Sequence, residues 1–169
     1  SPVQLRNGQF VNQVRDALRE FHTEPACLEL EITESVFLDD VEGALEQLHA
    51  LRGLGVRIAL DDFGTGYSSL AYLRQFPFDT LKVDRTFVSE VLSRTDSRAI
   101  VQMIAQLATT LGMRTVSEGV ETAQQLAAVG QAGCHEVQGF LVSRALPLAD
   151  FALFWHGWSG HPPLAATLH

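Results

Sequence analysis

One segment joins a short apolar run to two adjacent carboxylates and a glycine-rich loop: Val56-Arg57-Ile58-Ala59-Leu60-Asp61-Asp62-Phe63-Gly64-Thr65-Gly66-Tyr67-Ser68-Ser69. The apolar run is typical of a buried parallel strand. Two adjacent acids at its end are costly unless a positive charge lies nearby, and a divalent metal ion fits that need. Gly64 and Gly66 allow the backbone to turn sharply towards a ligand. The alternative is an Asp-rich turn that caps the next helix.

The composition is that of one globular domain. The 169 residues are 46% hydrophobic and 19% charged, which allows a sizeable core and excludes a disordered chain. The net charge of −8 argues against a DNA or RNA duplex as partner. We find no signal peptide and no apolar run that could span a bilayer. Cys27 and Cys134 are expected to be buried thiols in a reducing compartment. We therefore expect a cytoplasmic domain without membrane contact, although a parent protein with a membrane anchor stays open.

Strand and helix patterns alternate along the chain. Strands are predicted to begin near residues 28, 57, 80, 114 and 134, with helices between them, as in βα units of a parallel sheet. Each strand ends in polar groups: Glu31, Asp61 with Asp62, Lys82, Glu118 and Gln138. In a (β/α)₈ barrel these ends form one ring, where the chemistry takes place. A doubly wound open sheet, the competing fold, would concentrate function at one switch point. We favour an α/β fold of the TIM-type (β/α)₈ barrel, with about five of its eight strands in this chain.

The predicted ring has the residue types of a metal-dependent hydrolytic site. Glu31, Asp61 and Asp62 are candidate ligands for one or two Mg²⁺ or Mn²⁺ ions, which would clamp a phosphate group. Lys82 offers a positive charge for an attacking water or for the developing negative charge. Glu118 is a further ligand or a general base, and Gln138 can position water or substrate. A single acid of this kind is more often a surface carboxylate or part of an ion pair, but five consecutive strand ends favour a site.

The same residues resemble a known family. The chain from Ser1 to about Phe154 is similar to EAL domains, TIM-barrel phosphodiesterases that linearise cyclic di-GMP to pGpG with Mg²⁺ or Mn²⁺. The motifs that carry this resemblance are Glu31-Ile32-Thr33-Glu34-Ser35, Asp61-Asp62-Phe63-Gly64-Thr65-Gly66-Tyr67-Ser68-Ser69, Leu81-Lys82-Val83-Asp84, Ser117-Glu118-Gly119-Val120-Glu121 and Gln138-Gly139-Phe140.

The resemblance implies a role for each matching residue. It implies metal ligation by Glu31, Asp61 and Asp62, a nucleophilic water held by Lys82, and Glu118 as base or second-metal ligand. Glu121 and Gln138 would support the site. The dinucleotide would be contacted by Phe140, Ser143, Arg144 and Pro147. Glu34 would anchor a regulatory loop that couples the site to dimerisation, made of Phe63, Gly64, Thr65, Gly66, Tyr67, Ser68 and Ser69.

The resemblance also implies a boundary and a departure. Residues 1–156 would form a partial EAL domain and 157–169 a mobile tail. The Glu-Ala-Leu motif that names the family is absent, with its glutamate ligand, a following arginine and an asparagine ligand, so this chain alone is expected to be a poor enzyme. The leading hypothesis is a cyclic di-GMP phosphodiesterase in bacterial signalling and biofilm control, acting as a homodimer. The alternatives are a non-catalytic cyclic di-GMP receptor and an inactive fragment acting through binding or dimerisation. A fused or associated GGDEF or sensor domain stays open.

Overall fold

The computed structural model describes residues 4–5, 8–34, 41–64 and 70–158. Its centre is one sheet of five parallel strands: β1 (Glu29–Thr33), β2 (Arg57–Phe63), β3 (Thr80–Val83), β4 (Arg114–Glu118) and β5 (Glu136–Gln138). The strands lie in the sheet in the order in which they occur in the chain. A doubly wound sheet requires a reversal of strand order, and the five described strands have none. The predicted α/β fold with parallel strands is confirmed, and the winding is that of a barrel segment.

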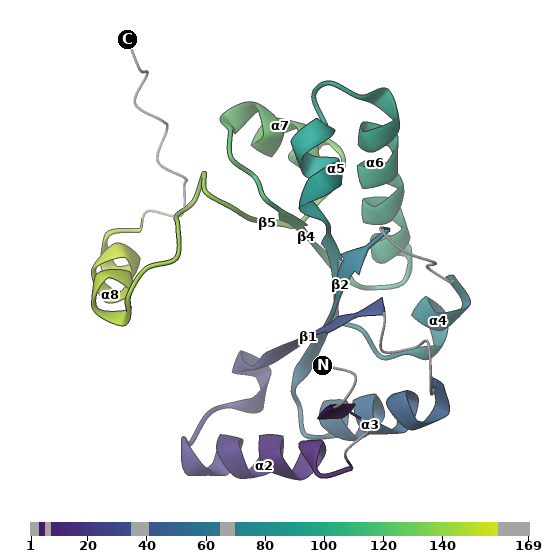
Figure 1. Cartoon of the computed structure of the whole chain (residues 1–169), viewed down its shortest axis with the longest axis vertical. Helices are drawn as coiled ribbons and strands as arrows, with labels where there is room; N and C mark the ends of the chain where they lie inside the picture. Colours follow the sequence, from purple (N-terminus) through teal and green to yellow (C-terminus); the bar gives the residue numbers. More distant parts are fainter. Residues whose placement is uncertain (1–3, 6–7, 35–40, 65–69, 159–169) are drawn as a thin grey trace.

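Helices follow the strands as predicted and cover one face of the sheet. Figure 1 shows α2 (Phe10–Glu20) and α3 (Val41–Gly53) near β1, with α5 (Arg85–Glu90), α6 (Thr95–Thr110) and α7 (Ala123–Gln131) gathered near β4 and β5. The shorter elements are the 3₁₀ helix η1 (Pro25–Cys27) and α4 (Leu70–Gln75). The last helix, α8 (Leu148–Gly157), lies apart from the others in Figure 1.

The two faces of the sheet differ because successive side chains of a strand point to opposite sides. Ile58, Leu60, Leu81 and Val83 are buried under the helices, where they pack with Leu48 and Leu51 of α3 and with Val101, Ile104 and Ala108 of α6. The alternating positions carry the polar side chains of Glu29, Glu31, Thr80 and Lys82, and hydrogen bonds join Thr80 to Glu29 and Lys82 to Glu31 from β3 to β1, across β2. The sheet therefore has an apolar face towards its helices and a polar face on the other side.

Two of the helices begin at residues whose side chains cap them. Thr122 precedes α7 and forms a full capping box with Gln125. The Thr122 hydroxyl accepts a hydrogen bond from Gln125 N at 3.2 Å, and Gln125 Oε1 accepts one from Thr122 N at 3.0 Å. The sequence does not predict α5, because Asp84 ends the motif Leu81-Lys82-Val83-Asp84 of the predicted third strand. Asp84 instead caps this six-residue helix, accepting a hydrogen bond from Thr86 N at 2.9 Å.

Two apolar side chains lie outside the interior, and one of them, Cys27, is predicted from the sequence to be buried. Phe21 follows the last residue of α2 and is 71% exposed, because the helix ends before the apolar stripe reaches it. Cys27 is exposed at the end of η1, whereas Cys134 is partly buried and loss of hydration raises its thiol pKa.

The C-terminal helix has no buried residue, and Leu148, Leu153 and Trp155 are exposed. Of the predicted mobile tail, Gly157 belongs to α8 and residues 159–169 lie outside the described part of the chain. Among the helices that the structure describes, we find none with both the length and the apolar character needed to cross a membrane.

Candidate active site

Lys82 lies at the centre of a group of carboxylates on the polar face of the sheet. Its Nζ is 2.6 Å from Glu31 Oε1, 2.6 Å from Glu118 Oε1 and 3.2 Å from Asp61 Oδ1. These acids come from β1, β4 and β2: β2 and β4 are the neighbours of β3 in the sheet, and β1 lies on the far side of β2. The Lys82 side chain is 5% exposed, so all three pairs lie around a buried ammonium group.

The surroundings of Lys82 keep it charged. Burial alone would lower its pKa, but the hydrogen bonds to Glu118 and Glu31, with the nearby negative charge of Asp61, outweigh burial and raise the pKa above its ordinary value. A charged lysine donates three hydrogen bonds and accepts none. Lys82 can therefore orient an oxygen atom or stabilise negative charge, but it cannot remove a proton.

Three carboxylates converge beside Lys82. Oxygen atoms of Asp61, Asp62 and Glu118 all lie within 4.8 Å of one another. Consecutive residues of a regular strand point to opposite faces, so Asp61 and Asp62 need an irregular backbone to share one side. Asp62 has a φ of 55°, and the pairing of β2 with β3 shifts register between Leu60 and Phe63. Asp is one of the few residues that accept this left-handed conformation, and the distortion turns both acids to one site.

The same cluster fits a divalent cation. Asp61 Oδ1 is buried and makes an ion pair with Lys82, but the direction of that contact is not that of a hydrogen bond. Loss of hydration and the neighbouring charges of Asp61 and Asp84 raise the pKa of Asp62. Oxygen ligands, excess negative charge and a buried lone pair are what Mg²⁺ or Mn²⁺ requires. Glu31, also predicted as a ligand, is not in this three-acid cluster and hydrogen-bonds to Lys82 instead.

Two glycines hold the ends of β4 and β5 together. A Cβ on Gly139 would lie 2.2 Å from Val120 O and 2.4 Å from Val120 N, so only hydrogen fits there. This approach lets Val120 N donate to Gln138 O at 3.1 Å and Val120 O accept from Leu141 N at 3.0 Å. Gly119 has a φ of 69°, and a Cβ on it would lie 2.6 Å from Cβ of Arg85. Both glycines follow a predicted site residue, Glu118 or Gln138.

A pocket of about 660 Å³ adjoins Lys82 on the polar face. Its lining includes Glu31 and Lys82 together with four residues of the predicted substrate set: Gln138, Phe140, Ser143 and Arg144. The Arg144 guanidinium lies over the Phe140 ring, 4.2 Å from its centroid, and Phe151 and Phe154 of α8 form another part of the wall. A cation stacked on an aromatic ring suits a planar, anionic ligand.

Other predicted residues lie away from this pocket. Glu121 and Pro147 are exposed and do not line it; Glu121 N donates to Gln125 Oε1, and Pro147 precedes α8. In the predicted regulatory loop, Phe63 is a core residue, and Gly64 N makes a long hydrogen bond of 3.4 Å to Glu34 Oε1. Thr65, Gly66, Tyr67, Ser68 and Ser69 lie outside the described residues.

Comparison with known proteins places this geometry in a family. A family model described as "EAL domain" matches residues 1–145. The cyclic di-GMP phosphodiesterase NbdA of Pseudomonas aeruginosa is 43% identical over 162 residues, which are 95% of this chain and 21% of NbdA. MucR of the same organism, a bifunctional diguanylate cyclase/cyclic di-GMP phosphodiesterase, is 44% identical over 147 residues, covering 87% of this chain and 22% of MucR. This chain thus spans about a fifth of the length of these relatives.

Solved structures agree with the sequence relatives. The PaMucR phosphodiesterase in complex with c-di-GMP matches with a TM-score of 0.85 and 42% identity, over 89% of this chain and 61% of that chain. BlrP1 of Klebsiella pneumoniae, in a complex with manganese and cy-diGMP, matches with a TM-score of 0.75 and 34% identity, over 80% of this chain and 34% of that chain. The five parallel strands therefore correspond to part of these structures.

Proposed function

We propose a function from one premise: this chain belongs to the EAL domain family. Its relatives include cyclic di-GMP phosphodiesterases. We infer that the chain contributes the Lys82 end of the sheet to a centre that hydrolyses cyclic di-GMP to linear pGpG. The observation that carries the proposal is the buried ammonium group of Lys82, held by Glu31, Asp61 and Glu118 beside the Asp61, Asp62 and Glu118 cluster.

In this proposal Asp61, Asp62 and Glu118 hold Mg²⁺ or Mn²⁺, with Glu31 as a further candidate ligand. A bound ion of this kind supplies positive charge for the phosphate oxygens and lowers the pKa of a coordinated water. The manganese complex of BlrP1 with cy-diGMP supports this choice of ion. The excess of acids over cations at the site supports it independently, because three carboxylates contact Lys82 and a fourth, Asp62, lies beside two of them.

The side chains of the site have separate roles in the proposed hydrolysis. Hydrolysis forms a bond between a water oxygen and phosphorus and breaks the bond from phosphorus to the ribose 3′ oxygen, which takes up a proton. Lys82 orients the water and stabilises the charge that develops on the phosphate. Glu118, one hydrogen bond from Lys82, is placed to accept the proton of the water. Gln138, Phe140, Ser143 and Arg144 would hold the dinucleotide in the adjoining pocket, with Glu121 and Pro147 supporting from outside it.

The remaining proposals concern regulation. We place the hydrogen bond from Gly64 N to Glu34 at the start of a loop that links the site to a homodimer interface. A diguanylate cyclase or sensor domain in the same protein is a further proposal, supported by the bifunctional relative MucR. We propose residues 1–156 as the part of the chain that acts as the domain, in the cytoplasm.

The test is turnover of cyclic di-GMP by the full-length protein that carries this chain, with Mn²⁺ or Mg²⁺ and with pGpG measured by chromatography. We expect Glu118→Gln and Asp61→Asn each to lower kcat by about 100-fold or more. Glu20→Gln, on the exposed side of α2, is the matched control and should not change kcat. Tight binding of cyclic di-GMP without turnover would overturn the phosphodiesterase proposal in favour of a receptor.

A further inference from the structure

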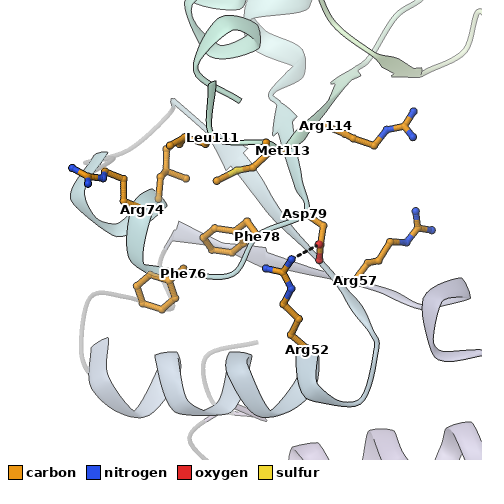
Figure 2. Close-up of a pocket in the computed structure, with 11 residues that line it drawn as sticks. Arg52, Arg57, Arg74, Phe76, Phe78, Asp79, Leu111, Met113 and Arg114 are labelled. Carbon is orange, nitrogen blue, oxygen red and sulfur yellow. Dashed lines mark ion pairs between the residues drawn. The ribbon is translucent and has the colours of Figure 1, made fainter. Parts of the chain in front are cut away.

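A second pocket lies at the opposite end of the sheet from Lys82. It has a volume of about 500 Å³ and is formed where β2, β3 and β4 begin, between the end of α3, α4 and the turn after α6. The Asp61, Asp62 and Glu118 cluster lies where β2 and β4 end. Nothing in the proposed function uses this pocket, which we call the arginine pocket (Figure 2).

The charge of the arginine pocket contrasts with that of the whole chain. Four of the twelve lysine and arginine residues line it, in a chain of net charge −8. Figure 2 shows Arg57 and Arg114 extending on one side of the pocket and Arg74 on the other, with Arg52 between them. Among the lining residues that the structure describes, Asp79 is the one acid.

The acids nearby neutralise only part of this charge. Asp79 Oδ1 pairs with Arg52 at 3.2 Å, and Asp79 Oδ2 accepts a hydrogen bond from Ile58 N at 3.0 Å, so each oxygen of this carboxylate already has a partner. Glu136, outside the pocket, pairs with Arg114 at 2.7 Å. Within the described part of the chain, neither Arg57 nor Arg74 has a carboxylate partner. Two exposed guanidinium groups on opposite sides of the pocket are therefore without a carboxylate partner among the described residues.

The floor between the arginines is apolar and rigid. Leu73, Phe76, Phe78 and Met113 are 3–6% exposed, and the rings of Phe76 and Phe78 stack with their centroids 5.9 Å apart. Figure 2 shows Phe78 and Met113 between the arginines of the two sides. Leu111 and Gly112 complete the rim, and no atom lies within 4 Å of a Cβ built on Gly112, so the rim is open there. The pocket combines a fixed apolar surface with movable cationic side chains.

We propose that the arginine pocket binds a small organic phosphate with at least two negative charges and a flat apolar part. Guanidinium groups bind phosphate oxygens in pairs, which is why arginine is favoured at such sites. The two exposed arginines, Arg57 and Arg74, match two or more ligand charges, and the apolar floor gives the rest of the ligand a surface to cover. The volume is in the range of small-molecule pockets, which favours a compact ligand over an acidic polypeptide segment.

The first experiment is calorimetric titration of the full-length protein with ADP and, separately, with inorganic pyrophosphate. EDTA is present, so that a metal ion at Asp61, Asp62 and Glu118 cannot capture the phosphates. We expect both probes to bind, ADP about tenfold more tightly because its base covers the apolar floor. ADP that binds no more tightly than pyrophosphate, or no binding of either at millimolar concentration, would overturn the proposal. So would binding of hexaglutamate in place of ADP, which would indicate an acidic partner.

Single substitutions test whether ADP binds in the arginine pocket. Arg57→Gln and Arg74→Gln, tested separately, should each weaken ADP binding by about tenfold, because each removes one charge-assisted contact. Arg57→Lys should give a smaller loss, since it keeps the charge and loses the planar fork. Arg19→Gln on α2 is the matched control and should leave ADP binding unchanged. Equal affinity in all four variants would place the ADP elsewhere and overturn the proposal.

Discussion

The two ends of the sheet carry opposite excess charge: acids predominate at one end and arginines at the other. At the end of β3 one cation, Lys82, lies among Glu31, Asp61 and Glu118. Before the start of β3 one anion, Asp79, lies within a pocket lined by four arginines. The difference is burial: the Lys82 side chain is 5% exposed, whereas those of Arg52 and Asp79 are 48% and 27% exposed. The cation of the acidic end is thus held inside the fold, whereas the ion pair of the arginine end lies partly in solvent.

The largest effect should come from removing the single cation of the acidic end. Lys82→Met keeps the volume of the side chain but leaves Glu31, Asp61 and Glu118 without their shared ammonium group. We expect hydrolysis of cyclic di-GMP to fall by about 10²–10³-fold, the range for loss of a group that stabilises developing charge. Steady-state kinetics with saturating Mn²⁺ provides the measurement. Arg19→Met is the control, and a Lys82→Met protein with kcat near that of the wild type would contradict the assigned role.

The next effect concerns the backbone that holds the acidic end. Gly139→Ala would place a Cβ 2.2 Å from Val120 O, so the ends of β4 and β5 must separate. We expect the free energy of unfolding to fall by about 2–3 kcal/mol in urea titrations. Gly130→Ala in α7 is the matched control: its Cβ meets nothing within 4 Å, and it should gain about 0.5–1 kcal/mol. If both variants changed the free energy of unfolding equally, the close contact with Val120 would not be what requires glycine at position 139.

A smaller effect is expected at Asp84, which follows β3. Burial alone would raise its pKa, but the hydrogen bonds from Thr86 outweigh burial and lower the pKa. A lowered pKa in the folded state stabilises the protein above the unfolded value of about 3.9, and this contribution is lost as pH falls through the folded value. Asp84→Ala should cost about 1 kcal/mol at pH 7, the usual value of a helix cap.

Asp84→Asn sharpens this test, because it keeps a capping oxygen but does not titrate. Its unfolding free energy should differ from that of the wild type at pH 7, and the difference should shrink towards zero as the pH falls below the pKa of Asp84. Urea titrations at several pH values measure it. A difference that does not depend on pH would mean that the charge of Asp84 makes no contribution to the cap.

The smallest effect is expected at the arginine end. Arg52→Gln removes the ion pair with Asp79, but Arg52 is about half exposed, so solvent screening limits the cost to about 0.2–1 kcal/mol. Asp79→Ala should cost more, because it also removes the acceptor of Ile58 N. Thermal unfolding of both variants would compare them. If Arg52→Gln were the more costly change, the arginine end would be as rigid as the acidic end.

The sequence predicted much of the fold because its signals are local. Short strand-like runs that end in polar groups located the five strands, and their alternation with helices indicated a parallel sheet. The short helix α5 was missed because six residues give too little periodicity, and Asp84 marks both the end of a strand and the start of a helix. Cys27 was misplaced because a small apolar side chain is usually buried, but η1 carries it at the surface.

The sequence predicts which residues form the candidate site but not how all of them are arranged. The ends of β1, β3 and β4 bring Glu31, Lys82 and Glu118 close together, and the prediction of a common cluster rests on parallel strands that end at one edge of the sheet. The pairing of Asp61 with Asp62 on one side could not follow from strand periodicity, which puts them on opposite faces. The left-handed backbone at Asp62 brings them together, and Asp followed closely by glycine was the signal for it. The sequence does not predict the arginine pocket, because its four arginines are 5 to 62 residues apart in the chain, between Arg52 and Arg114.

The order of the strands has a further consequence, for synthesis on the ribosome. Each of β2 to β5 pairs with the strand that was made immediately before it. Pairing partners that are near in sequence lose little chain entropy when they meet, and domains fold from the N-terminal side as they emerge. Among these five strands, each one after β1 therefore finds a pairing partner that has already been translated. This part of the protein can therefore assemble one βα unit at a time, with β1 as its template.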